Sequence, residues 1–125
     1  MQAMIVKNDA GIRRTPGTAL VNDATGKAVY EPPQDPQVIN KLLANFAQHL
    51  NARATTLADM AILHYQFESI HPFYDGNGRT GRILNILYLI LKGFLDIPIL
   101  YLSSQIIEQK DTYYALIRNV TSAAD

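Results

Sequence analysis

The side chains best suited to chemistry lie together in the segment 71–82, which reads HPFYDGNGRTGR. The segment combines one histidine, one aspartate, three glycines and two arginines. Glycines before a helix leave backbone N–H groups free to face an anion, and the helix dipole adds to that attraction. Arg79 and Arg82 are three residues apart and therefore share one face of a helix. The spacing predicts a polyphosphate site with a base at one end and a carboxylate that can hold a metal ion.

Each polar residue at the start of this segment has a chemical role and a structural alternative. Histidine takes and gives a proton near neutral pH, so His71 is the candidate general base, although it can also cap a helix. Asp75 offers the hard oxygen ligands that suit Mg²⁺ beside phosphates, but aspartate before glycine is also common in turns. The N–H groups of Gly76, Asn77 and Gly78 form either an anion-binding nest or a plain turn between two helices.

The end of the segment carries the candidate phosphate ligands. Planar, forked guanidinium groups suit phosphate oxygens, which favours this role for Arg79 and Arg82 over pairing with surface carboxylates. Phe73 is expected to anchor the segment in the core. Thr80 and Gly81 are expected to allow close helix packing. We assign the following residues of the segment to nucleotide binding: Phe73, Gly76, Asn77, Gly78, Arg79, Gly81 and Arg82.

Helices on both sides must position the segment. Apolar residues at helical spacing predict a helix over 57–70 that ends before the segment, because Pro72 disfavours helical backbone at His71. A helix is expected to resume near Gly78. The apolar run 83–91 leaves little polar face, which predicts a central helix buried on most sides.

The remaining elements are two more helices and a hairpin. Asp35 and Pro36 are typical of a helix start, and apolar spacing extends that helix to about Asn51. A last helix is expected from Ser103 or Ser104 to about residue 120. Two short β-prone runs around an Asn/Asp/Gly cluster predict a β-hairpin over 18–30. The expected fold is therefore one mainly α domain over residues 1–125 with a single small hairpin.

Composition excludes several classes of protein. Eleven basic and eleven acidic residues balance, so there is no overall attraction to nucleic acid or anionic lipid. The chain has no cysteine, which excludes disulfides and thiolate metal sites and fits a reducing, cytoplasmic compartment. No apolar run approaches the roughly 20 residues of a membrane-spanning helix, and no signal peptide is evident.

The segment 71–82 resembles the signature of the Fic family, His-Pro-Phe-x-Asp/Glu-Gly-Asn-Gly-Arg-x-x-Arg, and matches it at every fixed position. The resemblance covers nearly the whole chain. Residues 30–33 resemble the end of the family's flap, and residues 67–70 resemble the helix before the signature. Residues 100–103 and 113–114 resemble the helix after the core.

The resemblance implies a Fic-type helical bundle with a hairpin flap, and protein adenylylation as its activity. ATP would bind to the segment with Mg²⁺ on Asp75. A Ser, Thr or Tyr hydroxyl of a target protein would lose its proton to His71 and attack the α-phosphorus. By family likeness, Arg79 meets the inner phosphates and Arg82 reaches the γ-phosphate. The target protein would add as an extra strand to the hairpin 18–30.

Other activities remain open. The Doc-type kinase of the same family has lysine in place of the second loop glycine, so Gly78 argues against phosphorylation. Removal of AMP from modified proteins is a second rival, and a truncated module that binds nucleotide or target without catalysis is a third.

The family's inhibitory motif, Ser/Thr-x-x-x-Glu-Gly/Asn, has no full match in the chain. The nearest string is 104–109, where Gln109 fails the last position. We therefore expect a fragment or shortened form without inhibition in cis, with any inhibitory helix or small antitoxin partner supplied outside the chain. Homodimer formation stays open.

Overall fold

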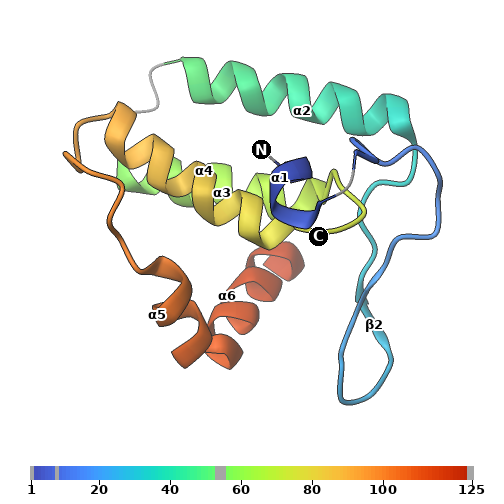
Figure 1. Cartoon of the computed structure of the whole chain (residues 1–125). Helices are drawn as coiled ribbons and strands as arrows, with labels where there is room; N and C mark the ends of the chain where they lie inside the picture. Colours follow the sequence, from blue (N-terminus) through green and yellow to red (C-terminus); the bar gives the residue numbers. More distant parts are fainter. Residues whose placement is uncertain (1, 8, 53–55, 124–125) are drawn as a thin grey trace. The chain divides into compact units, whose positions relative to one another are not determined.

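The computed structural model describes residues 2–7, 9–52 and 56–123, and is mainly helical with one two-stranded antiparallel sheet, as expected (Figure 1). The chain divides into two compact units, which we call unit 1 (Met1–Asn85) and unit 2 (Ile86–Asp125). The helices are α1 (Gln2–Val6), α2 (Pro36–Asn51), α3 (Leu57–Ile70), α4 (Asn77–Leu91), α5 (Leu102–Glu108) and α6 (Lys110–Ala123), and the strands are β1 (Leu20–Val21) and β2 (Ala28–Tyr30).

Helix α2 begins where the sequence predicted. The Asp35 side chain accepts a hydrogen bond from the N–H of Gln37 at 2.8 Å, and Pro36 occupies the first turn. Helix α3 starts with a reciprocal capping box, in which Thr56 and Asp59 each bond the other's backbone N–H. Local capping chemistry therefore fixes the start of both helices.

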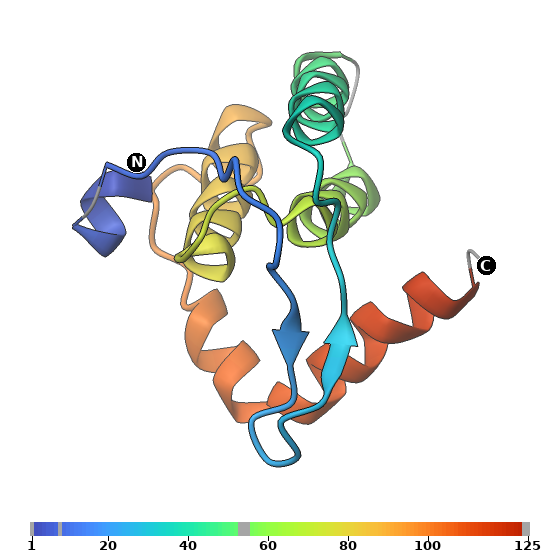
Figure 2. The same ribbon diagram turned by 90° about the vertical axis from the view of Figure 1, so that its right-hand side faces the viewer.

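The two helices pack through their apolar faces, and both views show them side by side (Figures 1 and 2). Ile39 and Phe46 of α2 are buried, as are Phe67 and Ile70 of α3. The rings of Phe46 and Phe67 lie 5.8 Å apart in a tilted arrangement. Full burial of side chains of this size contributes about 1.5–3 kcal/mol each, so this pairing holds the end of α3 in place.

The turn end of the hairpin extends away from α2 and α3 within unit 1 (Figure 2). Leu20 pairs with Tyr30 and Val21 with Ala28, with an irregularity between the two pairs. The Asn22 side chain accepts the N–H groups of Ala24 and Thr25, which closes the turn. The hairpin expected over 18–30 is thus present.

Helix α4 begins at Asn77 and ends before Gly93, whose φ of +75° suits a left-handed helix cap. The expectation that this helix is buried on most sides is wrong in part. Tyr88 and Leu89 are buried, but Leu87 and Leu91 are 49% and 69% exposed. These two residues are four apart, so one face of the last turns of α4 is left uncovered by the described residues.

Unit 2 also differs from expectation at its C-terminal end. The single predicted helix is two helices, α5 and α6, which meet at Gln109 with φ −114° and ψ 35°. Glutamine is an ordinary helix former, so the local sequence does not indicate this break. No helix in the described part of the chain is long and apolar enough to cross a bilayer.

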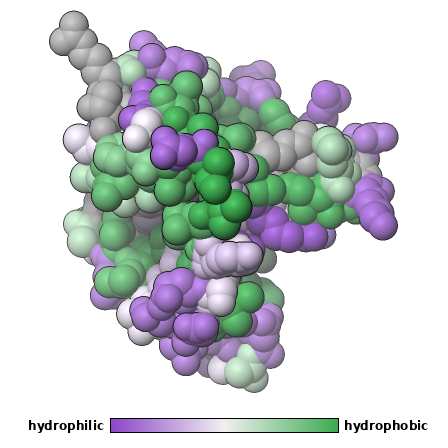
Figure 3. Space-filling view, turned by 60° about the vertical axis from the view of Figure 1, so that its left-hand side comes forward, coloured by the Kyte–Doolittle hydropathy of each residue, from purple (hydrophilic) through white to green (hydrophobic). Residues whose placement is uncertain are grey.

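Unit 2 exposes many large apolar side chains, and apolar patches are visible in the space-filling view (Figure 3). Several of them lie in the connector after α4 and on α5, and these include Ile97, Ile99, Tyr101 and Ile107.

Candidate nucleotide-binding site

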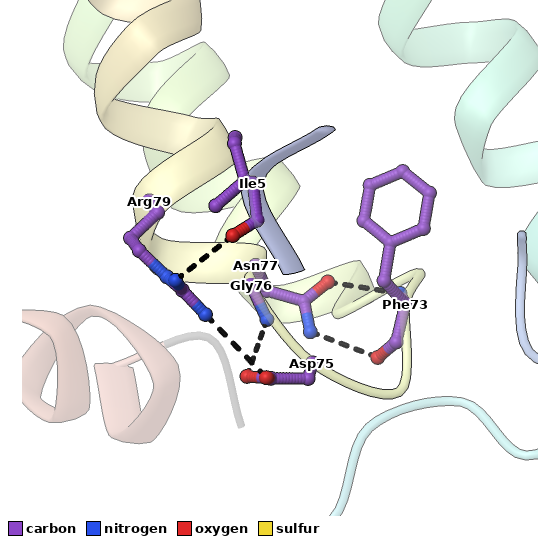
Figure 4. A network of polar contacts seen from close by, with 6 residues as sticks. All are labelled: Ile5, Phe73, Asp75, Gly76, Asn77 and Arg79. Atoms are coloured by element: carbon purple, nitrogen blue, oxygen red, sulfur yellow. Dashed lines mark hydrogen bonds and ion pairs between the residues drawn. The ribbon is translucent and has the colours of Figure 1, made fainter. Parts of the chain in front are cut away.

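The segment 71–82 forms a tight turn between α3 and α4, all of it within unit 1. Helix α3 ends at His71, whose φ of +48° and ψ of +59° place it in the left-handed region. Asn77 closes the turn from the other side. Its amide nitrogen donates to the Phe73 carbonyl at 2.8 Å and its oxygen accepts the Phe73 N–H at 2.9 Å (Figure 4). Asn77 is buried, so this reciprocal pair fixes the loop.

Phe73 anchors the turn as expected. Its ring lies 6.3 Å from that of Phe67, and its backbone forms an isolated antiparallel bridge with Ile12. Gly76 has a φ of +79°, a conformation that L side chains rarely adopt. The bonds between the Asn77 side chain and the Phe73 backbone therefore fix the shape of the turn.

Helix α4 presents unpaired backbone donors at its start. The N–H of Thr80 bonds the Gly76 carbonyl at 2.9 Å, and that of Gly76 bonds the Asp75 carboxylate at 2.6 Å. No described residue accepts the N–H groups of Asn77, Gly78 or Arg79. These three donors and the helix dipole are the arrangement that favours phosphate.

Arg79 is held by two neighbours beside these donors. Its guanidinium lies 3.4 Å from the Asp75 carboxylate and donates to the Ile5 carbonyl at 3.3 Å (Figure 4). Helix α1, which the sequence did not predict, therefore contacts the turn. A Cβ added to Gly76 would lie 2.7 Å from Cγ1 of Val6, so α1 covers one side of this glycine.

Asp75 has the features of a magnesium ligand. Its side chain is 69% exposed, and Mg²⁺ usually binds one or two carboxylates, with phosphate oxygens and water as the other ligands. An exposed carboxylate just before α4 is compatible with such an ion. The described residues hold no group of three or more His, Cys, Asp or Glu side chains that would enclose a metal by themselves. The magnesium role of Asp75 stays a prediction.

Arg82 lies on the side of α4 that meets α3. A Cβ added to Gly81 would lie 2.6 Å from Glu68 Oε1, 3.3 Å from the Phe67 ring and 3.4 Å from His64, so α3 and α4 approach closely here. Burial raises the pKa of Glu68 to about 7, and the charge of Arg82 acts in the opposite direction. Burial lowers the pKa of His64, and the charge of Arg82 lowers it further.

His71 is partly buried at the end of α3, and its Nδ1 atom is inaccessible to solvent. Burial lowers the pKa of His71, the backbone of Glu68 opposes that shift, and the charge of Arg13 adds to it. A lowered pKa keeps the imidazole neutral at neutral pH, which is the form that accepts a proton. The left-handed conformation and the pKa direction both fit a base, and the role itself stays a prediction.

Sequence reasoning missed three side chains that support the turn. Arg13, in the segment before the hairpin, is fully buried and bonds the His71 carbonyl. Tyr30 at the end of β2 donates to the Ser69 carbonyl at 2.9 Å. Glu68 lies against Gly81. The spacing of Glu68, one helical turn before the segment, was the only local signal among the three.

The chain is similar to several curated proteins. It is 36% identical over 98 residues to a Fido domain-containing protein of Dictyostelium discoideum. This alignment covers 71% of this chain and 68% of that protein. It is 39% identical over 66 residues to the protein adenylyltransferase fic-1 of Caenorhabditis briggsae, covering 50% of this chain. It is 39% identical over 72 residues to a probable protein adenylyltransferase of Aquifex aeolicus, covering 56% of this chain.

The fold is shared with a solved structure of a Fic family protein from Desulfovibrio desulfuricans G20, at a TM-score of 0.76 and 26% identity over 99% of this chain. The matches span only 13% of the nematode protein, 22% of the Aquifex protein and 38% of the Desulfovibrio chain. The model of the Fic/DOC family matches residues 2–89, which is more than half of the chain and includes the whole turn. The chain therefore belongs to the Fic/DOC family.

Proposed function

We propose that this chain is a protein adenylyltransferase that moves AMP from ATP to a Ser, Thr or Tyr hydroxyl of a target protein. The observation that carries the proposal is the turn itself. Within one short segment the chain combines His71 at the end of α3, three N–H groups without an acceptor among the described residues, and two arginines in the first turns of α4, which supports the proposal. The nematode and Aquifex relatives are named as adenylyltransferases, which agrees with this reaction.

His71 takes the proton in the proposed step. Because Nδ1 is buried, Nε2 is the nitrogen that can meet a substrate hydroxyl. As the proton moves to Nε2, the hydroxyl oxygen forms a bond to the α-phosphorus and the bond from that phosphorus to the bridging oxygen breaks. Pyrophosphate leaves with the bonding electron pair. Positioning and electrostatic stabilisation provide most of the acceleration in reactions of this kind.

The start of α4 holds the phosphates. The amides of Asn77, Gly78 and Arg79 donate to phosphate oxygens, and the side chains of Arg79 and Arg82 balance the charge of the departing pyrophosphate. Asp75 would hold Mg²⁺, which would supply further positive charge to the phosphates. Arg79 must release Asp75 or Ile5, or share them, when phosphate arrives.

The hairpin is the proposed dock for the target protein. Val21 and Val29 are 52% and 44% exposed, and a two-stranded sheet leaves an unpaired edge on each strand. A target segment that adds to one edge would bring its hydroxyl toward His71 through main-chain bonds alone. An inhibitory partner from outside the chain, a homodimer and a cytoplasmic location stay predictions.

Replacement of the base tests the reaction. The protein is incubated with a lysate and with ATP labelled at the α- or the γ-phosphate. We expect label from α-labelled ATP only. The rate of AMP transfer should fall at least 100-fold in His71→Ala, since general bases contribute roughly 10²–10⁴-fold. ATP binding, measured by calorimetry, should persist in this variant.

The matched control is His49→Ala, because His49 is an exposed histidine of α2 outside the turn. It should label as the wild type does. Transfer of γ-label would instead indicate a kinase, and binding of ATP without any transfer would indicate a non-catalytic module. Undiminished transfer by His71→Ala would remove the base from the proposal.

A further inference from the structure

A buried guanidinium lies behind the turn that carries His71. Arg13 has 0% of its surface exposed, although it follows Gly11 and precedes Pro16 and Gly17 in a segment without helix or strand. An arginine in such a segment is ordinarily solvated, because burial of an unpaired charge is unfavourable. The described residues offer this guanidinium carbonyl oxygens and no carboxylate.

Those carbonyl oxygens come from two places far apart in the sequence. Arg13 donates through Nε to His71 at 2.6 Å and through Nη2 to Ile70 at 3.1 Å, which are carbonyls at the C-terminal end of α3. Nη2 also donates to the Pro33 carbonyl, just after β2. A cation at the end of a helix is favoured by the helix dipole, and bonds from a charged donor are the stronger kind.

The backbone of the same segment adds to this hold. The Arg13 N–H bonds the Pro72 carbonyl at 2.9 Å, so residue 13 contacts three successive carbonyls from Ile70 to Pro72. The middle one belongs to His71, a non-glycine residue in the left-handed region at φ +48°. Strained conformations of this type persist only where surrounding contacts over-determine them, and they cluster at functional sites. Arg13 supplies those contacts.

Arg13 also acts on His71 through its charge. It is the positively charged residue whose proximity lowers the pKa of His71, in addition to the larger effect of burial. The groups that act on the imidazole therefore come from two elements: Glu68 of α3 through its backbone, and Arg13 of the N-terminal segment.

We propose that Arg13 is a positioning residue of the transfer reaction, one that fixes the left-handed His71 peptide and ties it to the base of the hairpin. The proposal rests on the proposed function, because it takes His71 as the base and the hairpin as the target dock. The Arg13 guanidinium then sets the distance between His71, which accepts the proton, and the hairpin, where the target protein would present its hydroxyl. Arg13 touches neither nucleotide nor target.

Two substitutions separate geometry from charge. Arg13→Lys keeps the positive charge but loses the planar fork that reaches three carbonyls, and Arg13→Met loses both. The matched control is Arg14→Met, because Arg14 is exposed and bonds Tyr74 through its backbone N–H, which the substitution retains. Circular dichroism shows whether each variant is folded.

Steady-state labelling gives the first readout. Both Arg13 variants should lower kcat at least tenfold with KM for ATP within about twofold of wild type, because the phosphate-binding amides are not touched. In Arg13→Met the acid limb of the pH profile should also move to higher pH by about half a unit, since the lost charge raises the pKa of His71. Arg13→Lys should keep the acid limb of the wild-type pH profile. Arg14→Met should keep the wild-type kcat and KM for ATP.

Titration of the imidazole by NMR gives a second readout that needs no activity. The His71 resonance, assigned by its loss in His71→Ala, should titrate at higher pH in Arg13→Met than in wild type, with His49 as the internal control. A wild type without AMP transfer would defeat the proposed function, yet this titration would still test Arg13.

Wild-type kcat in a folded Arg13 variant, or an unmoved His71 titration in folded Arg13→Met, would overturn the proposal. If Arg13→Met does not fold, kcat of Arg13→Lys decides: a wild-type value overturns the proposal, and a tenfold loss at unchanged KM supports it.

Discussion

Glu68 shows how one residue can link the fold to the candidate site. Its Oε1 atom is buried against Gly81 and finds no hydrogen-bond partner among the described residues. A buried carboxyl without a partner favours its neutral form, and the charge of Arg82 only partly offsets this. Protonation of Glu68 therefore removes a negative charge that otherwise acts on Arg82.

The raised pKa of Glu68 predicts a pH-dependent stability. Between about 4.5 and about 7 the folded protein keeps a proton that the unfolded chain releases, so Glu68 reduces the free energy of unfolding as pH rises through this window. Glu68→Gln removes that titration. We expect the variant to be more stable than wild type at pH 8 by about 1–3 kcal/mol, measured by urea unfolding at a series of pH values.

The difference between the two curves isolates Glu68, because His64 and His71 contribute to both. Glu31→Gln is the control, since Glu31 is exposed and should follow the wild-type curve. A Glu68→Gln curve parallel to wild type from pH 4.5 to 8 would contradict the buried, uncompensated carboxyl.

The candidate site depends on how closely α3 and α4 approach each other. Gly81 is the contact that permits this approach, because an added methyl group would meet Glu68 Oε1 at 2.6 Å and the Phe67 ring at 3.3 Å. Gly78, one turn earlier, is less constrained, since its added methyl would meet only the flexible end of Arg82 at 3.2 Å and Glu68 at 4.0 Å. The two glycines therefore have different functions in the same helix.

Substitution of each glycine by alanine tests that difference. Both changes gain helix propensity, by up to about 1 kcal/mol. Gly81→Ala also introduces overpacking between two helices, which typically destabilises by about 1–3 kcal/mol. We expect Gly78→Ala to unfold at an equal or higher urea concentration than wild type and Gly81→Ala at a lower one. Equal stabilities would show that α3 and α4 move apart without penalty.

At the scale of the whole molecule, every residue assigned to the site lies in unit 1. The turn, Arg13, Glu68 and the hairpin all belong to residues 1–85, whereas α5 and α6 belong to unit 2. Unit 2 instead exposes apolar side chains of its connector and helices, a composition more typical of a contact surface than of a nucleotide site.

This division predicts where nucleotide will stabilise the chain. Saturating ATP with Mg²⁺ should slow hydrogen exchange at the amides of 71–82 and leave those of 102–123 nearly unchanged. At a concentration 100 times the dissociation constant, binding adds about 2.7 kcal/mol to the stability of the state that binds. Exchange followed by mass spectrometry measures both regions, and adenosine, which lacks phosphates, is the control. Protection centred on α5 and α6 would place the nucleotide elsewhere.

The sequence by itself determined the elements and the turn, because caps, helical spacing and loop chemistry act over a few residues. Asp35, Thr56, Pro72 and Gly93 mark helix ends locally, and the run 71–82 carries its own turn residues and charges. Tertiary structure alone decided what surrounds them. Arg13 bonds a carbonyl 58 residues away, and α1 meets Arg79 across 74 residues. Burial and charge at His71 come from such distant contacts, which no local pattern encodes.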